Sequence, residues 1–494
     1  MTGTGLLSAG SRVPRWYVKE KKVTRAHSSS WGAPYSSGLP GTAHLVGIGG
    51  CGMAGLARLL VQLGVRVSGS DRTLGRRVES LRRQGVRISR SQDASLVGEA
   101  ELVVRSAAVP DTVPDVRAAL DAGTEVVSYA EMLGRLLRTR DAAVICGTHG
   151  KTTTTAMVAS CLVRAGFAPG YLVGGSVPEL GHPADVGRSP LFVAEGCEYG
   201  RSFLHLLPRA AVVTNVEAEH LDTYPGGLPE IQDAFRAFIG NVRREGLVVL
   251  PERLRGVLLP SWLQTKVRTF GDSPGADWRA EELFQIRGCF RFVARAPAFS
   301  ASIPIGLSVP GMHNVSNALA AVALLHELGV GPADIGRGLS DFRGVERRLQ
   351  TVPCSGAVTL LDDYAHHPTE VRAVLAATRG CHPTATIWTV FQPHLLSRLR
   401  AFLDDFALAL LLADQVLVAP VYGAREASAP GELVSESVRL TRAVLDRGGE
   451  AIFLPDHSSI VEHLARRIQP GDVVLTLGAG DVTDVCRVLA GQLA

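Results

Sequence analysis

Lysine is scarce in this chain: its 494 residues include five lysines against 46 arginines. Three of the five lie within the first 22 residues, and only Lys151 and Lys266 follow. Arginine carries a planar, forked cation, whereas lysine carries a compact ammonium group that can reach between phosphate oxygens. Because the chain otherwise uses arginine, the lysine at position 151 is a candidate for contact with a nucleotide phosphate.

Long apolar runs, paired cysteines and basic stripes are also absent. No run of 18 apolar residues occurs, so we expect no membrane-spanning helix. The eight cysteines form no C-x-x-C pair, so neither a disulfide framework nor a zinc cage is indicated. Arginines are scattered and aromatic residues make up only 6%, so we expect no nucleic-acid partner despite a net charge of +4. Together these features favour a globular, cytoplasmic protein.

The chain divides into a short basic segment and three longer units. Residues 1–42 are rich in serine and basic residues and contain no apolar core of a secretory signal, so we expect a disordered extension or a start codon placed too early. From His44 onward, short apolar runs alternate with helical patterns, which predicts α/β domains with parallel sheets. We place these domains at 43–138, 139–345 and 346–494.

A glycine-rich turn follows the first apolar run of the body. Residues Gly47–Gly52 match G-x-G-x-x-G between a predicted strand and a predicted helix, and Asp71 follows the next strand. Such a turn lets the backbone approach a diphosphate at a helix N-terminus, with the acid near a ribose. A dinucleotide such as NAD and the diphosphate of a UDP-sugar both fit this description, as does a turn without a ligand.

A second glycine loop contains Lys151. Residues Gly147–Thr152 end in Gly-Lys-Thr directly after an apolar run, although the loop is shorter than a full Walker A motif because position 145 is Ile. Its backbone N–H groups would face phosphate oxygens, Lys151 would reach the β- and γ-phosphates, and the Thr152 hydroxyl would ligate Mg²⁺. The sequence therefore predicts an ATP site.

Acidic residues and a histidine follow two further apolar strands. Glu195 ends the run 192–195, and His220 lies in the stretch Thr214–Asp222 after the next strand. Ligands of open α/β sheets bind beyond the carboxyl ends of the strands, so both side chains are expected near the phosphate loop. Carboxylates suit Mg²⁺ and make Glu195 the stronger candidate, while His220 is a less usual ligand. The alternative for each acid is a solvated loop carboxylate.

Six motifs follow one another along residues 43–494. They are Gly47–Gly55, Gly147–Thr155, Thr214–Tyr224, Gly311–Ala320, Asp362–Glu370 and Phe391–His394. In this order and at these spacings they resemble the motifs of the Mur ligase family. The resemblance implies a Rossmann-like UDP-binding domain, a central P-loop ATPase domain and a C-terminal Rossmann-like domain that binds the amino acid.

The resemblance also implies a reaction and its participants. ATP and Mg²⁺ would convert the carboxylate of UDP-N-acetylmuramate to an acyl phosphate, and the amine of L-alanine would attack it, in the first peptide step of peptidoglycan precursor synthesis. Motif by motif, the resemblance assigns catalysis to Lys151, Glu195, His220 and Arg348, and magnesium binding to Thr152, Glu195 and His220. It assigns ATP contacts to Gly147, Thr148, His149, Gly150, Lys151, Thr152, Thr153, His313, Asn314, Asn317, Arg347, Arg348 and Asp363. It assigns contacts with the UDP-substrate to Gly49, Gly50, Cys51, Gly52, Met53, Asp71 and Ser106, and contacts with the amino acid to Tyr364, His366 and Arg398.

The chain departs from the family pattern at two places. Residues 195–200 keep only the inner acid of an expected Asp-Glu-Ser-Asp run, and Leu395 replaces a common arginine while Arg398 is retained. The preference among alanine, glycine and serine therefore stays open. By contrast, the absence of lysine from residues 152–265 argues against the family branch that uses a carbamylated lysine near a second metal.

Other functions stay open at this stage. A muropeptide ligase would attach a preformed peptide to the same nucleotide sugar, and Phe391–His394 favours alanine over that alternative. An NAD-dependent oxidoreductase would use the first glycine loop but leaves Lys151 unexplained. A non-enzymatic nucleotide-binding regulator would not need two phosphate-facing loops. The sequence does not choose between a monomer and a dimer.

Overall fold

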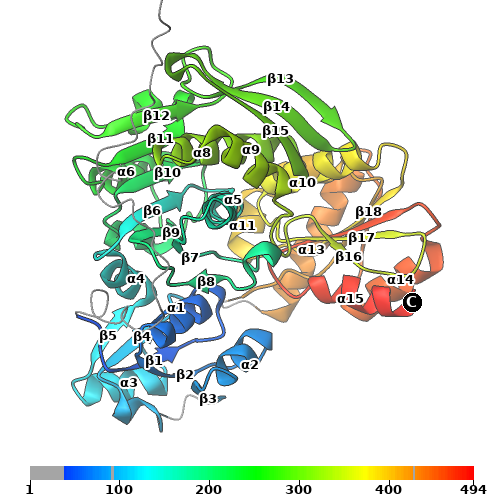
Figure 1. Ribbon diagram of the computed structural model, residues 1–494. Helices are drawn as coiled ribbons and strands as arrows, with labels where there is room; N and C mark the ends of the chain where they lie inside the picture. Colours follow the sequence, from blue (N-terminus) through cyan, green and yellow to red (C-terminus); the bar gives the residue numbers. More distant parts are fainter. Residues whose placement is uncertain (1–37, 91–93, 425, 427–428, 494) are drawn as a thin grey trace, which may run out of the picture.

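The computed structural model describes residues 38–90, 94–424, 426 and 429–493. The chain forms three successive units, and each is built around a mainly parallel sheet (Figure 1). We call the units with the five-, seven- and six-stranded sheets the first, central and third domains. The predicted α/β class is therefore confirmed. Of the segment 1–42, residues 1–37 lie outside the described residues.

The first domain is a five-stranded parallel sheet in the order β3-β2-β1-β4-β5. The strand order reverses between β1 and β4, and a ligand crevice of an open α/β sheet opens at such a point. Its strands are β1 (Thr42–Val46), β2 (Arg66–Ser70), β3 (Arg87–Ser89), β4 (Leu102–Arg105) and β5 (Glu125–Ser128), and its helices are α1 (Cys51–Gln62), α2 (Arg76–Arg82), α3 (Pro114–Asp121) and α4 (Tyr129–Leu137).

The central domain contains a seven-stranded sheet in the order β12-β11-β10-β6-β9-β7-β8, in which only β8 runs antiparallel. Its strands are β6 (Asp141–Cys146), β7 (Gly170–Leu172), β8 (Ala184–Asp185), β9 (Leu191–Glu195), β10 (Ala210–Val213), β11 (Leu247–Pro251) and β12 (Lys266–Phe270). Its helices are α5 (Lys151–Arg164), α6 (Leu228–Gly240), α7 (Arg255–Leu258), α8 (Met312–Glu327) and α9 (Pro332–Asp341). An antiparallel sheet of β13 (Arg279–Ile286), β14 (Cys289–Ala296) and β15 (Ala301–Pro310) lies over α8 and α9 (Figure 1).

The third domain contains a six-stranded sheet in the order β16-β17-β21-β18-β19-β20, in which only β16 is antiparallel. Its strands are β16 (Gln350–Val352), β17 (Thr359–Asp363), β18 (Ile387–Phe391), β19 (Gln415–Val418), β20 (Ala451–Phe453) and β21 (Val473–Leu477). Its helices are α10 (Pro368–Cys381), α11 (Leu396–Ala401), α12 (Leu403–Leu410), α13 (Pro430–Leu445), α14 (His457–Arg467) and α15 (Thr483–Gln492).

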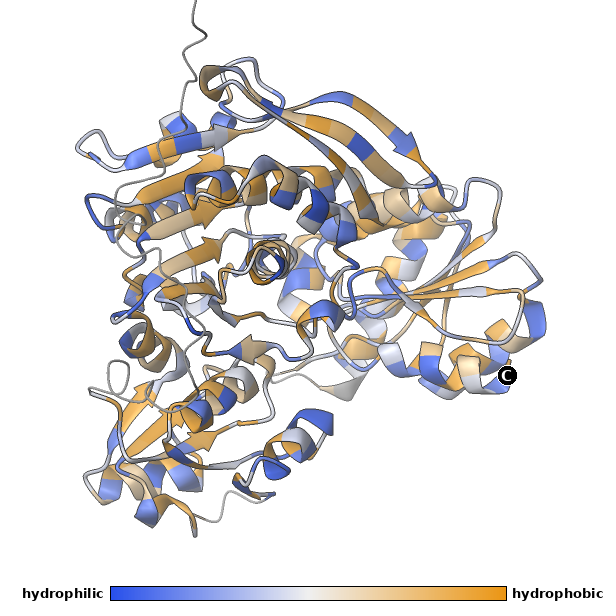
Figure 2. Cartoon of the chain, in the orientation of Figure 1, coloured by the Kyte–Doolittle hydropathy of each residue, from blue (hydrophilic) through white to orange (hydrophobic). Residues whose placement is uncertain are grey.

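The central strands are buried on both faces. In β6, Ala142 and Val144 pack into one apolar cluster, while Ala143 and Ile145 pack into the cluster on the opposite face. Parallel strands covered by helices on both sides show this continuous apolar pattern. Figure 2 shows it as hydrophobic strands beneath helices with hydrophilic outer faces. The loops that follow the carboxyl ends of these strands therefore start from rigidly packed positions.

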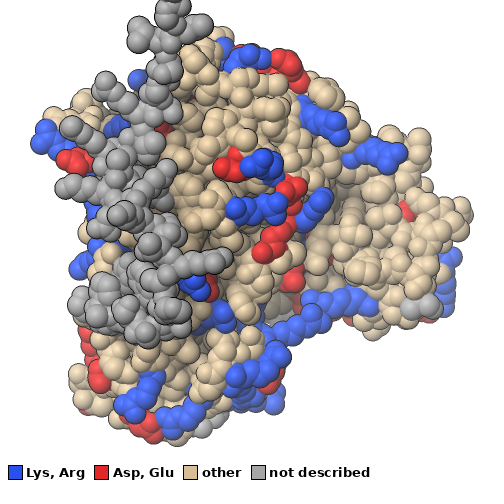
Figure 3. Space-filling view, in the orientation of Figure 1, with Lys and Arg blue, Asp and Glu red and all other residues tan. Residues whose placement is uncertain are grey.

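The proposed domain boundaries fall in the connections between these sheets. The boundary at 138/139 lies between α4 and β6, and that at 345/346 lies between α9 and β16. Basic and acidic side chains are mixed over the middle of the face drawn in Figure 3. Among the described residues, no helix is long and apolar enough to cross a membrane.

Candidate functional site

The first glycine turn lies at the carboxyl end of β1, at the point where the strand order reverses. Gly47 has a φ of +80°, and a Cβ there would lie 3.2 Å from the Cβ of Ser106, which follows β4. Glycine is therefore required for this close approach. Helix α1 then begins at Cys51 without a side-chain cap, so its first N–H groups are available to an anion.

The other residues predicted for the UDP-substrate have different roles in this fold. Asp71 accepts hydrogen bonds from the backbone N–H groups of Gly49 and Thr73, each at 2.8 Å, and so holds the turn in shape. The Cys51 thiol donates to the carbonyl of Gly174 in the central domain at 2.8 Å. Met53 is buried in the core below the turn. Met53 could therefore meet a diphosphate only through its backbone.

The second glycine loop connects β6 to α5. Gly147 and Gly150 have φ values of +134° and +79°, which favour glycine over residues with a Cβ. A Cβ on Gly150 would also lie 2.4 Å from the side-chain oxygen of Asn317, on α8. Helix α5 starts at Lys151 without a side-chain cap, so its N-terminal N–H groups face the loop. The loop has the geometry that cradles phosphate groups.

Lys151 is held by a carboxylate that the sequence predictions did not include. Its Nζ donates to both carboxylate oxygens of Glu198, at 2.9 and 3.1 Å, and to the carbonyls of Gly147 and Thr148. The Glu198 carboxylate is almost fully buried. Burial lowers the pKa of Lys151, but the charge and hydrogen bonds of Glu198, together with the nearby Cys197 and Glu195, raise that pKa overall. Lys151 is therefore a fixed cation at the mouth of the loop.

Glu195, Thr152 and His220 surround this ammonium group. The Thr152 hydroxyl donates to Glu195 at 3.0 Å, and the N–H of Gly174 donates to the other carboxylate oxygen. Burial raises the pKa of Glu195. His220 Nε2 lies 3.6 Å from a carboxylate oxygen of Glu198. A hydroxyl, the half-buried Glu195 carboxylate and the buried Glu198 carboxylate supply the oxygen atoms that Mg²⁺ prefers, and the His220 imidazole lies beside them.

A cavity of about 230 Å³ opens beside the loop, between the central and third domains. A subset of the residues predicted to contact ATP lines it, namely His149, Gly150, Thr153, His313, Asn314, Asn317, Arg348 and Asp363. Burial lowers the pKa of His313 to about 4. A neutral imidazole and two amides at one end, with an arginine nearby, suit a nucleotide base and its phosphates.

The two adjacent arginines predicted near the phosphates point in different directions. Arg347 adopts a φ of +59° and donates to the carbonyls of Gly478 and Gly480 in the third domain. Arg348 lines the cavity instead. Asp363 accepts the N–H groups of Leu349 and Ala365, and burial raises its pKa to about 6. Of the two arginines, Arg348 is the one placed to reach a nucleotide.

The residues predicted for the amino acid gather in the third domain. The Tyr364 and His366 rings lie 5.4 Å apart, and the His366 and His394 rings lie 5.8 Å apart. Burial lowers the pKa of His366 to about 4, so this imidazole is neutral at physiological pH. Arg398 is directed to the central domain, where its Nε and Nη2 donate to Glu219 at 2.9 and 2.7 Å.

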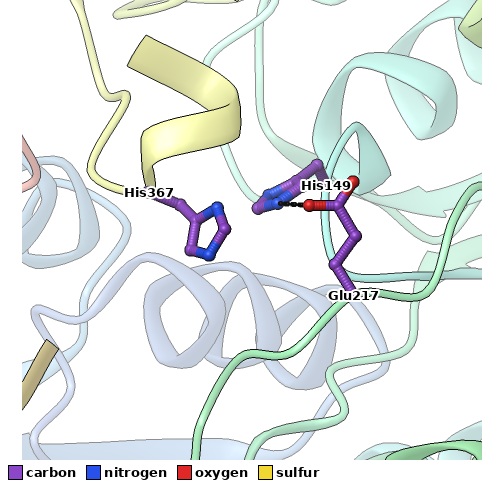
Figure 4. A group of neighbouring side chains, drawn as sticks. All are labelled: His149, Glu217 and His367. Atoms are coloured by element: carbon purple, nitrogen blue, oxygen red, sulfur yellow. Dashed lines mark ion pairs between the residues drawn. The ribbon is translucent and has the colours of Figure 1, made fainter. Parts of the chain in front are cut away.

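A third group joins the two domains through histidines (Figure 4). His149 Nδ1 lies 3.2 Å from Glu370, and its Nε2 lies 3.6 Å from Glu217. His367 stands at the start of α10, and one potential ligand atom each of His149, Glu217 and His367 lies within 4.8 Å of the others. Burial lowers the pKa of His149, but the charges of Glu370 and Glu217 raise it to about 9. His149 is therefore an imidazolium between two carboxylates, which accounts for this group without a metal.

This imidazolium predicts a pH-dependent stability. Because the pKa of His149 rises from 6.5 to about 9 in the folded protein, its contribution is complete below pH 6.5 and is lost as the pH rises through 9. We expect the unfolding free energy of the wild type to fall by up to about 1.4 kcal/mol per pH unit across this window relative to His149→Asn. Urea titrations at pH 6 to 10 measure the difference.

His326→Asn is the matched control, because burial lowers the pKa of His326 and keeps that ring uncharged over the same window. Its profile should follow the wild type. Parallel profiles for the wild type and His149→Asn would contradict the assignment of charge to His149.

Four glutamates of the site were given no individual role by the sequence predictions: Glu198, Glu217, Glu219 and Glu370. Glu198 lies three residues after Glu195, and Glu217 and Glu219 lie in the stretch that contains His220. Glu198 and Glu217 pair with Lys151 and His149 inside the central domain. Glu219 and Glu370 pair across the domain interface, with Arg398 and His149 respectively. The sequence signals were the position of the first three after buried strands and the place of Glu370 at the end of the motif Asp362–Glu370.

Comparison with known proteins connects this geometry to one family. Models of a Mur ligase family catalytic domain, a Mur ligase middle domain and a Mur ligase glutamate ligase domain match residues 42–141, 145–325 and 347–480. The UDP-N-acetylmuramate–L-alanine ligase of Halorhodospira halophila is 42% identical, with 91% of this chain and 93% of the relative covered. That of Thermobifida fusca is 39% identical, with 90% and 95% covered.

Solved structures give the same result. The UDP-N-acetylmuramate–alanine ligase of Thermotoga maritima superposes with a TM-score of 0.78 at 28% identity, covering 91% of this chain and 98% of that one. A murein peptide ligase from Psychrobacter arcticus superposes with a TM-score of 0.71 at 25% identity, with 92% and 98% covered. The family models and the regions aligned with these relatives extend over all three domains. The chain belongs to the Mur ligase family.

Proposed function

We propose that this protein is an ATP-dependent ligase that joins L-alanine to the carboxylate of UDP-N-acetylmuramate. The observation that carries the proposal is the Lys151 ammonium, fixed by Glu198 at the start of α5 and flanked by Thr152 and Glu195. The cavity beside it contains the side chains suited to a nucleotide. The names of relatives about 40% identical over most of the chain support the substrates.

The reaction begins with phosphoryl transfer. A carboxylate oxygen of UDP-N-acetylmuramate attacks the γ-phosphorus of ATP, the bond to the bridging oxygen breaks, and ADP leaves. Lys151 and the N–H groups of α5 stabilise the charge on the transferring group, and Arg348 approaches it from the cavity. Thr152, Glu195 and His220 would hold Mg²⁺, which neutralises phosphate charge when it is bound.

The second step forms the amide. The amine of L-alanine attacks the acyl carbon and forms the C–N bond of a tetrahedral intermediate. Collapse of this intermediate breaks the carbon–oxygen bond to phosphate, which leaves. Tyr364 and His366 border the space proposed for the amino acid, and the neutral His366 can accept a proton from the attacking amine. Docking of the third domain excludes water, which would otherwise hydrolyse the acyl phosphate. We propose that the protein acts in the cytoplasm.

The first domain would bind the UDP portion of the substrate. Its glycine turn stands at the reversal point of the sheet and at the uncapped start of α1, so a diphosphate there would meet backbone N–H groups. The contact from Cys51 to Gly174 connects this turn to the backbone segment that also donates to Glu195. The muramoyl carboxylate is thereby directed towards the phosphate loop.

The substrate choice is testable by phosphate release. Purified protein with ATP, Mg²⁺ and UDP-N-acetylmuramate should release phosphate with L-alanine, and at a lower kcat/KM with glycine and L-serine. The murein tripeptide tests the peptide-ligase alternative, which the resemblance to the Psychrobacter arcticus structure keeps relevant. No release with any amino acid would contradict the proposal, and release with the tripeptide alone would replace L-alanine as the substrate.

A further inference from the structure

Glu219 and His220 are neighbours whose side chains face different domains. The segment that contains them follows β10 in the central domain. His220 turns back into that domain, where its Nε2 lies 3.6 Å from Glu198 and its ring packs against Tyr199 with 5.0 Å between centroids. Glu219 turns outward to the third domain and meets Arg398. One dipeptide therefore contains a proposed metal ligand, His220, and also contacts the docked domain through Glu219.

The contact between Glu219 and Arg398 uses most of the guanidinium. Two of its nitrogens donate to the same carboxylate oxygen at 2.9 and 2.7 Å, and the third, Nη1, donates to the carbonyl of His394 at 3.1 Å. Both charged side chains are at least nine-tenths buried. His367 Nε2 lies 3.8 Å from the other oxygen of Glu219, and burial lowers the pKa of that imidazole, so Arg398 is the charged partner of the pair. A buried pair of this kind holds both partners in one geometry.

The same carboxylate also reaches the backbone of its neighbour. The N–H of His220 donates to Glu219 at 3.2 Å. His220 has a φ of +54°, a left-handed conformation that costs a non-glycine residue about 1–3 kcal/mol and persists only where the surroundings enforce it. The carbonyl of His220 accepts the N–H groups of Thr223 and Tyr224, which hold it from the other side. The orientation of the imidazole thus depends in part on Glu219.

We propose that Glu219 is a positioning residue that couples docking of the third domain to the orientation of His220 at the metal site. When Arg398 arrives with the third domain, it fixes the carboxylate that braces the His220 backbone. In the undocked protein Glu219 lacks this partner, so His220 is held less firmly. The proposal rests on the proposed function, because it assigns His220 to the metal and the third domain to the amino acid.

Glu219→Gln tests this role, with Glu327→Gln as the matched control. Glu327 is also a buried carboxylate of the central domain with two basic partners, Lys266 and Arg268, each at 2.6 Å, but both partners belong to the central domain. Each variant removes one buried charge and leaves basic partners unpaired. The two variants should therefore lose similar amounts of stability, and they should differ only in their effects on the metal and amino-acid sites. Glu219→Asp keeps the charge on a shorter side chain, so it still tests the role of Glu219 if Glu219→Gln does not fold.

The readouts are Mn²⁺ affinity, measured by electron paramagnetic resonance with a non-hydrolysable ATP analogue, and the KM for L-alanine. We expect Glu219→Gln to weaken Mn²⁺ binding about 10-fold or more, as loss of a group that orients a metal ligand does, and to raise the KM in parallel. Glu219→Asp should lie between this variant and the wild type. Glu327→Gln should leave both values unchanged.

Two outcomes separate failure of this inference from failure of the proposed function. If Glu219→Gln changes only the melting temperature, to the same extent as Glu327→Gln, Glu219 is a structural ion-pair partner and the inference is wrong. If the wild type does not ligate L-alanine, the proposed function fails, while the Mn²⁺ measurement still decides whether Glu219 positions His220.

Discussion

Lys151→Arg should lose turnover while the protein stays folded. Arginine retains the positive charge that Glu198 requires, so the buried pair survives and the melting temperature should change little. The planar guanidinium cannot take the place of an ammonium whose four acceptors all lie within 3.1 Å. Loss of a preorganised donor to the transferring phosphoryl group should lower kcat at least about 100-fold. Phosphate release and thermal unfolding measure the two effects.

Two further lysine variants separate chemistry from stability. Lys151→Met removes the charge and leaves Glu198 buried without its cation, so it should lose activity and about 3–5 kcal/mol of unfolding free energy. Lys266→Arg is the matched control, since Lys266 pairs with Glu327 in the same domain and its side chain is half exposed. That variant should be as active as the wild type. An active Lys151→Arg enzyme would show that a compact ammonium is not needed at the loop.

Glu195→Gln is expected to abolish activity without loss of stability. Burial raises the pKa of Glu195, so its charged form is less favourable in the folded protein than in the unfolded chain when no metal is bound. An amide of the same size can still accept the Thr152 hydroxyl and the Gly174 N–H through its oxygen. The unfolding free energy should therefore stay equal or rise, whereas kcat should fall at least about 100-fold because the charge that holds Mg²⁺ is gone.

Denaturant titration and phosphate release at several Mg²⁺ concentrations test this variant. Glu230→Gln serves as a control, because it removes a surface carboxylate paired with Arg201 away from the metal ligands. We expect wild-type rates and wild-type magnesium dependence for the control. A Glu195→Gln enzyme that reaches the wild-type rate at high Mg²⁺ would mean that Glu195 tunes metal affinity and is not required for the chemistry.

The local parts of the site follow from the sequence because they depend on a few adjacent residues. The run 142–146 specifies a strand buried on both faces, and the glycines after it specify a turn into the helix that starts at Lys151. The α/β class and the family follow from the repetition of this pattern and from the order of the motifs. For these features, neighbouring residues contain the necessary information.

The partners of the charged residues could not be predicted in the same way. Glu219 and Arg398 are 179 positions apart and meet only when two domains dock. Arg347 and Arg348 are adjacent and chemically identical, but in the fold Arg347 is left-handed and bonds to Gly478 and Gly480, while Arg348 lines the cavity. The roles of the individual site residues remain predictions that mutants must test. Backbone conformation and domain docking determine these contacts.

Transfer of oxygen from substrate to phosphate tests the central claim most directly. UDP-N-acetylmuramate labelled with ¹⁸O in its carboxylate is incubated with the enzyme, ATP and L-alanine, and the released phosphate is analysed by mass spectrometry. An acyl phosphate formed at the Lys151 loop breaks at the carbon–oxygen bond, so one ¹⁸O atom from the carboxylate should appear in each phosphate. Amide formation with phosphate that contains no ¹⁸O would contradict the acyl-phosphate mechanism.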